Sequence, residues 1–572
     1  MIDTPTSPPG ATAQIAGEAR QRAHKQSALF DERLLVGGLI ALLLLLAALP
    51  TIFAYLSSPP DRRFQGIVYG VADTAQYFSW LRDHRGAWLV PNRMTSEPND
   101  PALFNLLWLA VGRLQAATGL ATPLLFQAVR VVAGAALLVM LYLACVRFTQ
   151  GRAERLTAFL VLTLGAGLGW VWVLVKYLQG LADVPFPLDL YVAEPNTLFI
   201  LIAFPHFAIA TSLILGIFLC YLAALRRRSP QLVAVAALLA LTLTLQHAYD
   251  LLIITLVPGG FLALKLLRTR RIPWLAGLAA LAIGLAALPP ALYFTVLTSG
   301  DPLWREVLAQ FSNAGVFTPP PHHLLILMGL PLLLVGAALL DALVRPGRVQ
   351  RLRHAFATAS NETLFLWSWF LVGFALLYIP TDFQIHMLTA WQVPVGLIGV
   401  RWLHRRAIPA VAAHQPRLAR ALPSLLLIAV LPTSVYLVSW RMLDLGRHAA
   451  PYSLGADEVQ ALDWLGARAT RDDVVLSGLT LGQYVPVYSD ARTFLGHWAQ
   501  TAHFYEKRAA VASFFQAAAS DDARRLLLKR HGVSYVIHGA EEQALGGFDP
   551  ASSPLFEAVF HAGATTMYRV RR

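Results

Sequence analysis

Residues 34–56 read LLVGGLIALLLLLAALPTIFAYL, an apolar run without a charged side chain. Because a helix rises about 1.5 Å per residue, such a run is long enough to cross the roughly 30 Å hydrocarbon core of a bilayer. Comparable runs recur at 122–147, 156–178, 197–225, 231–248, 249–268, 273–298, 322–344, 362–380, 385–403 and 421–441. The pattern predicts an α-helical polytopic membrane protein with about eleven transmembrane helices, in a membrane domain that covers residues 34–441.

The composition leads to the same class of protein. Of the 572 residues, 56% are hydrophobic and only 14% are charged, which leaves too little polar surface for a soluble protein of this size. The net charge of +13 would suit a nucleic-acid binder if the cations shared one face, but they lie between apolar runs. We therefore expect membrane lipids as partners and no nucleic acid. Cys145 and Cys220 both lie inside apolar runs and predict no disulfide framework.

Every second connection between the apolar runs is basic, and this pattern predicts the orientation of the spans in the membrane. The basic clusters are Arg20, Arg22, Lys25 and Arg33; Arg147, Arg152 and Arg155; Arg226, Arg227 and Arg228; Lys265, Arg268, Arg270 and Arg271; Arg345, Arg348, Arg351 and Arg353; and Arg401, Arg405, Arg406, Arg417 and Arg420. Because cytoplasmic loops carry the excess of Lys and Arg, the tail 1–33 is expected in the cytoplasm. The segments 57–121, 179–196 and 299–321 and the tail after about 442 are then outside.

Pro101–Gly112 (PALFNLLWLAVG) is apolar enough to suggest a further span. Counting it as a span would place the Arg147 cluster outside and invert every later basic loop, so we predict an amphipathic helix at the membrane interface instead. The first outer loop, 57–121, is then roughly 65 residues long, and loops of that length are uncommon without a function.

The last part of the chain, 442–572, differs from the rest in its alternating pattern. Helices are expected at Asp457–Ala469, Thr501–Ala518 and Asp521–His531, and strands at Val474–Ser477, Val533–His538, Leu555–Phe560 and Thr566–Val570. This order predicts a small extracytoplasmic α/β domain. It contains no Gly-rich phosphate-binding fingerprint.

The stretch Val71–Asp83 (VADTAQYFSWLRD) follows the first span on the predicted outer side. It predicts a helix that begins just after Asp73, with Gln76, Tyr77 and Trp80 on the following turns. The simplest interpretation of Asp73 is an N-cap, since Asp is a preferred capping residue. A role of this carboxylate in binding or catalysis is the alternative.

The outer segment 179–196 contains Asp183, Asp189 and Glu194 without a Lys or Arg among them. Such carboxylates either bind a divalent cation through oxygen ligands or are solvated loop charges. Ionisable residues within or beside apolar runs are costly and are therefore candidates for a site, although a single His is more often structural. They are Lys176, His206, His247, Asp250, His322, His323, Asp382 and His386. Most fall at the predicted outer face, where they would suit a phosphate-bearing lipid.

These residues resemble the GT-C superfamily of membrane glycosyltransferases. Members carry an Asp with a Tyr a few residues later in the first outer loop, as Asp73 and Tyr77 do here in DTAQY. Their His-Pro-Pro-Leu or Lys-Pro-Pro-Leu element is matched by Asn99-Asp100-Pro101-Ala102-Leu103, without its cation. The outer domain also resembles those of bacterial members, in ALDWL, in Gly496, His497, Trp498 and Thr501, and in Tyr535–Ile537.

The resemblance implies transfer of a sugar from a polyprenyl-phosphate donor to a glycan, lipid or protein acceptor, outside a bacterial cytoplasmic membrane and with inversion. It implies that Asp73 is the catalytic carboxylate, either as the base toward the acceptor hydroxyl or as a metal ligand, and that Asp189 or Glu194 supports a divalent cation, Mg or Mn. Residues expected to bind donor or acceptor are Tyr77, Arg82, Arg85, Asp100, His206, His247, Asp250 and His322, with Arg93 a further candidate for the lipid phosphate.

A transporter or lipid flippase is the main alternative, and a non-catalytic scaffold is another. A transporter predicts two related halves with spans broken at matching places and charges near the middle of the membrane. The sequence shows no such symmetry. We therefore favour the enzyme.

Overall fold

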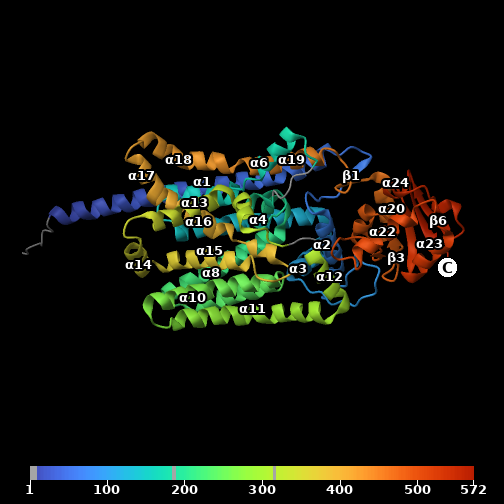
Figure 1. Cartoon of the computed structure of the whole chain (residues 1–572), viewed down its shortest axis with the longest axis horizontal. Coiled ribbons are helices and arrows are strands. Elements are labelled where there is room, and N and C mark those ends of the chain that lie inside the picture. Colours follow the sequence, from blue (N-terminus) through green and yellow to red (C-terminus); the bar gives the residue numbers. More distant parts are fainter. Residues whose placement is uncertain (1–8, 183–187, 314–316, 572) are drawn as a thin grey trace, which may run out of the picture.

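The computed structural model describes residues 9–182, 188–313 and 317–571, with a long helical bundle and a small α/β unit at one end of it (Figure 1). The helices of the bundle are α1 Pro9–Ser57, α4 Thr122–Phe148, α5 Arg152–Leu164, α6 Gly169–Gln179, α7 Thr197–Ala203, α8 Pro205–Arg227, α9 Pro230–Thr244, α10 Leu251–Thr269, α11 Trp274–Gly300, α13 Leu324–Val344, α14 Arg348–Thr358, α15 Asn361–Leu376, α16 Gln392–Trp402, α17 Ile408–Ala412, α18 Pro416–Val430 and α19 Pro432–Leu445. The predicted helical polytopic class is confirmed.

The expected number of spans is not confirmed. Among the described residues, seven helical segments are long and apolar enough to cross a membrane, or eight if α5 and α6, bent by 46° relative to each other, count as one. The other expected runs are helical but short. Helix α9 has 15 residues, α15 has 16 and α16 has 11. Helices α7 and α8 are separated at Phe204, whose extended backbone is typical of a residue before proline.

The bundle has an aromatic interior and an apolar exterior. Phe218 packs edge-on against Phe365 and Trp369, with ring centroids 5.0 and 4.9 Å away. On α11, Leu278 and Leu285 are 61% and 57% exposed. Exposed leucines of this kind suit a surface that faces lipid.

Ion pairs between basic and acidic side chains join the helices in the part of the bundle that lies away from the α/β unit. Arg155 contacts Glu32 at 2.6 Å, Arg147 contacts Glu362 at 2.6 Å and Arg405 contacts Glu154 at 3.0 Å. In Figure 1, α14 and α17 lie at this same end. The basic loops of the sequence therefore gather at the end opposite the α/β unit.

The segment 57–121, which the sequence predicts to be the first outer loop, is structured and lies between the bundle and the α/β unit (Figure 1). It contains β1 Arg62–Phe64, α2 Val71–His84 and α3 Leu106–Thr118. Helix α3 starts later than expected, because the Asn105 side chain caps it by accepting a hydrogen bond from the Trp108 amide at 3.2 Å. Its 13 residues are too few to cross a bilayer. A further helix, α12 Pro302–Asn313, comes from the segment 299–321, also predicted to be an outer loop.

The expected α/β character of the C-terminal unit is confirmed. Its elements are β2 Ser453–Gly455, α20 Ala456–Gly466, β3 Val474–Leu476, α21 Leu479–Tyr488, β4 Arg492–Thr493, α22 Phe504–Phe514, α23 Asp521–Arg530, β5 Val533–His538, α24 Ala540–Leu545, β6 Phe556–Ala562 and β7 Thr565–Val570. The sheet order is β4-β3-β5-β7-β6. The strands β4, β3 and β5 are parallel, whereas β7 is antiparallel to both β5 and β6. The expected helix 501–518 is shorter, and α21 was not expected.

The first outer loop and the α/β unit are joined by hydrogen bonds. Strand β1 pairs with β2, so that Arg63 lies opposite Leu454. The buried Thr501 hydroxyl donates to the Met94 carbonyl. These contacts place α2 between the unit and the bundle, and thereby position the site described next.

Candidate active site

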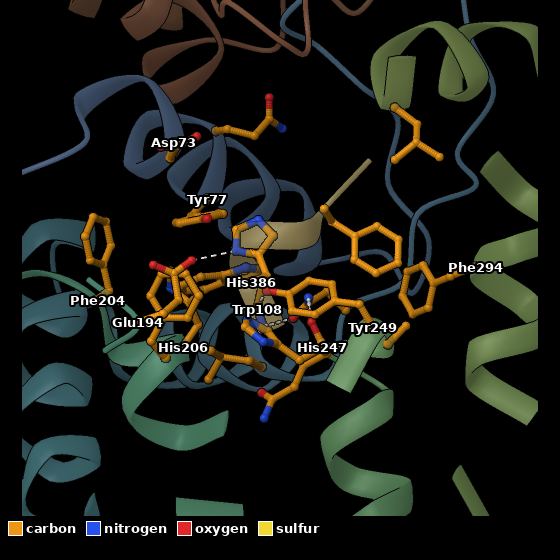
Figure 2. Close-up of a pocket in the computed structure, with 18 of the residues that line it drawn as sticks. Asp73, Tyr77, Trp108, Glu194, Phe204, His206, His247, Tyr249, Phe294 and His386 are labelled. Carbon is orange, nitrogen blue, oxygen red and sulfur yellow. Dashed lines mark hydrogen bonds and ion pairs between the residues drawn. The ribbon is translucent and has the colours of Figure 1, made fainter. Parts of the chain in front are cut away.

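A cavity of about 690 Å³ lies where α2 and α3, the α/β unit and the nearby ends of the bundle helices meet. Its wall combines carboxylate, imidazole and aromatic side chains. Figure 2 shows Asp73 and Tyr77 on one side, with Glu194, His206, His247 and His386 gathered beyond them. The cavity therefore brings together polar residues from segments far apart in the chain.

Asp73 lies in the first turn of α2 and is not its N-cap. The cap is Gly70, which has a left-handed backbone with φ of 54° and therefore starts the helix earlier than expected. The capping interpretation of Asp73 is wrong for this reason. Its side chain is 37% exposed, lines the cavity and accepts a hydrogen bond at Oδ1 from His497 Nε2 at 3.1 Å.

His497 belongs to the α/β unit, and its second ring nitrogen determines its tautomer. Nδ1 accepts hydrogen bonds from the amides of Ala499 at 2.9 Å and Gln500 at 3.1 Å. Since an acceptor nitrogen carries no proton, the neutral ring bears its proton on Nε2 and donates it to Asp73. The His497 side chain is only 2% exposed. A buried turn thus orients the Asp73 carboxylate and leaves its Oδ2 for another group.

Glu194 and His386 form the second polar pair of the cavity. Nδ1 of His386 donates to Glu194 Oε1 at 2.6 Å, and Tyr249 stacks on the imidazole with a centroid distance of 4.9 Å. His386 lies in the turn Gln384–Leu388, outside the seven candidate spans. Burial lowers the pKa of His386, but the hydrogen bond and charge of Glu194 outweigh this effect and raise it above its usual value.

His247 and His206 extend the polar wall. His247 Nδ1 contacts Asp250 Oδ2 at 3.2 Å, and the His247 ring lies 5.5 Å from that of His206. Nδ1 of His206 is buried and has no hydrogen-bond partner among the described residues. Tyr77 stacks on Trp108 at 4.7 Å and meets the edge of His206 at 5.0 Å. Asp250 lies behind His247 and supports it without lining the cavity.

Other residues expected at the site lie elsewhere. Arg82 pairs with Asp490 of the α/β unit at 3.0 Å, Arg93 pairs with Asp83 at 2.7 Å, and Arg85 donates to the Arg82 carbonyl. The ion pairs of Arg82 and Arg93 fix the position of α2. Neither Asp100 nor His322, both exposed, lines the cavity.

The expected metal-binding carboxylates are not neighbours in one site. Asp189 is buried away from the cavity and accepts from the Gly169 amide at the start of α6 at 3.2 Å, while Glu194 is paired with His386. Asp183 lies outside the described residues. Among residues 9–182, 188–313 and 317–571, no group of three His, Cys, Asp or Glu side chains is placed to hold a metal ion. Asp189 and Glu194 therefore do not form one carboxylate site.

Sequence reasoning missed the role of His497, although its Gly-His-Trp context was noted. The partner of His497 is 424 residues away in the chain, so that no local spacing reveals the contact. Tyr249 and Trp108 were missed as well, because aromatic residues next to apolar runs are common. His386 was recognised as a candidate but not its pairing with Glu194.

No protein-family model matches the sequence. No curated protein matches it. Among solved structures, the chain is similar to the oligosaccharyltransferase of Archaeoglobus fulgidus in the apo form, with a TM-score of 0.51 and 12% identity over 87% of this chain and 69% of that chain. The same protein tethered with an acceptor peptide has a TM-score of 0.50, with 12% identity and the same shares covered. ArnT from Cupriavidus metallidurans in the apo state has a TM-score of 0.46 and 13% identity over 92% of this chain and 97% of that chain.

The likeness to the oligosaccharyltransferase concerns the fold. It extends over 87% of this chain. The architecture expected from the sequence is therefore confirmed as a fold that this chain shares with an oligosaccharyltransferase.

Proposed function

We propose that this protein is a membrane glycosyltransferase that transfers a sugar from a polyprenyl-phosphate donor to an acceptor hydroxyl or amide. The observation that carries the proposal is the contact of Asp73 with His497 at 3.1 Å, on the wall of a large cavity that also holds three histidines. This arrangement supplies an oriented carboxylate on one wall and imidazoles on the other. The fold shared with an oligosaccharyltransferase supports the same reaction class.

Asp73 acts as the general base in this proposal. His497 occupies Oδ1, so that Oδ2 accepts the proton of the acceptor while the acceptor atom attacks the anomeric carbon. A bond forms between the acceptor atom and that carbon, and the bond from the carbon to the phosphate oxygen breaks. The lipid phosphate leaves with the electron pair and needs no acid, since it is already an anion. A single displacement of this kind inverts the anomeric configuration.

The imidazoles on the opposite wall bind the lipid phosphate. His386 is held by Glu194 through Nδ1 and, as an imidazolium, donates from Nε2. His206 contributes its unpaired Nδ1, and His247 is oriented by Asp250. Charge-assisted hydrogen bonds to a phosphate are stronger than those between neutral groups. The arginines expected in this role have other partners, Arg82 with Asp490, Arg93 with Asp83 and Arg85 with the Arg82 carbonyl, so the histidines replace them.

The same architecture supports an extracytoplasmic site. The basic loops gather at the end of the bundle away from the α/β unit, as Arg155, Arg147 and Arg405 show. By the bias of cytoplasmic loops toward Lys and Arg, this end faces the cytoplasm. The cavity and the α/β unit then face outward, in the cytoplasmic membrane of a bacterium.

Two cysteine variants test this orientation. Ser520 on the α/β unit and Ala357 on α14 are both exposed, at opposite ends of the molecule. In intact cells, an impermeant maleimide is expected to label Ser520→Cys and to label Ala357→Cys only after the membrane is breached. The reverse pattern would contradict the proposed side of the reaction.

The reaction itself is tested with purified protein in vesicles that contain undecaprenyl-phosphate monosaccharides. Mass spectrometry of surface glycans and lipids from cells with and without the gene identifies the acceptor to add. Release of undecaprenyl phosphate together with a glycosylated acceptor is the expected result. Movement of the intact glycolipid across the bilayer without cleavage would support a flippase and overturn the enzyme.

A further inference from the structure

We propose that Gln76, Trp80 and Gln500 form the subsite that holds the sugar ring of the donor through its hydroxyl groups. This inference rests on the proposed function and adds the part of the cavity that recognises the sugar. All three side chains line the cavity and are buried, with 1%, 9% and 6% of their surface exposed.

Polar atoms of these three residues lack partners. Within the part of the chain that the structure describes, neither amide atom of Gln76 makes a hydrogen bond, nor do Nε1 of Trp80 and Oε1 of Gln500. Buried polar atoms are nearly always paired, because an unpaired one has lost its hydration without compensation. Because the three residues that carry these atoms line one cavity, we infer that a polar ligand bound there completes them after a small side-chain adjustment.

Their positions in the chain place them next to the proposed base. Gln76 follows Asp73 by three residues on α2, and residues with this spacing lie on the same face of a helix. Trp80 is one turn further along that face. Gln500 donates its backbone amide to the His497 ring, which in turn contacts Asp73. The Asp73–His497 contact therefore brings both glutamines to the region where the anomeric carbon reacts.

The chemistry of these groups fits a sugar ring better than the other parts of the donor. A carboxamide offers donors and acceptors together, which matches hydroxyl groups that both donate and accept. An acceptor oxygen such as Oε1 of Gln500 would repel a phosphate, and unpaired amides do not suit a polyprenyl chain. Indole groups such as Trp80 provide an apolar face with one N–H donor at its edge. Phosphate and sugar thus occupy different walls.

Binding of two lipids separates this subsite from the phosphate site. Purified wild type and Gln76→Leu are titrated with undecaprenyl phosphate and with its mannosyl, glucosyl, galactosyl and N-acetylglucosaminyl derivatives. For Gln76→Leu we expect unchanged affinity for the bare lipid and about tenfold weaker affinity for the glycolipid that wild type prefers. The melting temperature without ligand should stay level or rise, since leucine removes two unpaired buried atoms.

Gln115→Leu is the matched control. Oε1 of Gln115 is also buried without a partner, but this residue lies on α3 away from the cavity. Its substitution should leave both affinities unchanged. Gln500→Leu provides a second test, with the same expected loss, should Gln76→Leu not fold.

The outcomes distinguish the two proposals. Equal glycolipid affinity in wild type, Gln76→Leu and Gln500→Leu would overturn the sugar subsite while leaving the enzyme in place. Reduced transfer with unchanged glycolipid affinity would assign these residues to the acceptor and overturn the donor assignment. If wild type binds neither undecaprenyl phosphate nor its glycosides, the proposed function itself is wrong.

Discussion

The two polar walls of the cavity differ in how they hold their carboxylates. Asp73 belongs to α2, is 37% exposed and is oriented by a histidine of the α/β unit. Glu194 belongs to the bundle, is 5% exposed and is paired with a histidine of the same bundle. A base must exchange its proton with solvent after each reaction, whereas a group that supports phosphate binding acts more strongly where water is excluded. The exposed wall therefore suits chemistry and the buried wall suits binding.

The largest expected effect is on the exposed wall. Asp73→Asn keeps the size of the side chain and removes the charge that a base requires. We expect the transfer rate to fall about a hundredfold to ten-thousandfold, the range for the loss of a general base. Donor affinity and the amount of membrane-inserted protein should stay level. Normal transfer by the Asn variant would show that the carboxylate is not the base.

His497→Asn is expected to have the next largest effect. The Asn side chain can still accept from the amides of Ala499 and Gln500, as Nδ1 does, but does not reach Asp73. Because orientation of the base is lost while the turn remains, we expect transfer to fall about tenfold to a hundredfold, by analogy with partners that orient metal ligands. The protein should melt near the wild-type temperature.

A double-mutant cycle decides whether His497 acts through Asp73. In the Asp73→Asn background, the further change His497→Asn should have little effect on the remaining transfer rate. Independent effects that multiply would mean that His497 only supports the fold of the α/β unit.

For variants of the buried wall we expect weaker binding of undecaprenyl phosphate. His386→Ala removes a charge-assisted donor to the phosphate, worth about 1.5–3 kcal/mol, and should weaken binding of undecaprenyl phosphate about tenfold to a hundredfold. Glu194→Ala should weaken it in the same direction, because it removes the partner that orients His386. The rate at saturating donor should change little in either variant.

Asp189→Ala is the control for this wall. Asp189 contacts the start of α6 and not the cavity, so its loss should reduce stability by about 1–2 kcal/mol without changing donor affinity. An unchanged affinity in His386→Ala and Glu194→Ala, or a reduced affinity in Asp189→Ala, would contradict the assignment of phosphate binding to this pair.

The helical bundle could be predicted because apolar runs are a local property of the sequence. The number of spans could not, since Pro205 separates α7 from α8, and packing determines where short helices such as α9 and α16 end. The α/β unit could be predicted because expected helices and strands alternate along its sequence. Its short helix α21 was missed because Pro486 lies within it.

The candidate site was predictable only in part. Asp73 could be found from its spacing to Tyr77, but its capping role was wrong because Gly70 starts the helix. Arg82 was expected to bind phosphate, yet its partner Asp490 is 408 residues away. Contacts of such long range depend on how the α/β unit docks, which no local pattern records. For the same reason, the sequence could not predict that Nδ1 of His497 accepts hydrogen bonds and that Nε2 donates one.

The smallest expected effect concerns the docking of the α/β unit itself. Lys507 on α22 contacts Glu97 of the first outer loop at 2.6 Å. Burial raises the pKa of Glu97, but the charge and hydrogen bond of Lys507 and the Thr95 hydroxyl outweigh it, so that the pKa lies below the ordinary 4.5. A carboxylate whose pKa is lowered by folding stabilises the folded protein at pH values above its ordinary pKa. This stabilisation is lost as the pH falls through the pKa of the folded state.

We therefore expect wild type to lose thermal stability between pH 6 and pH 3.5 more steeply than the variant Glu97→Gln/Lys507→Met. The double change removes both charges, so that no buried ammonium is left unpaired. Because Glu97 is 32% exposed, solvent limits the difference between the two proteins to about 1 kcal/mol at the acid end. Calorimetry across this pH range measures it, with the exposed Glu557→Gln as a control that should follow wild type. Equal acid-induced losses in wild type and the double variant would show that this ion pair does not stabilise the docked arrangement.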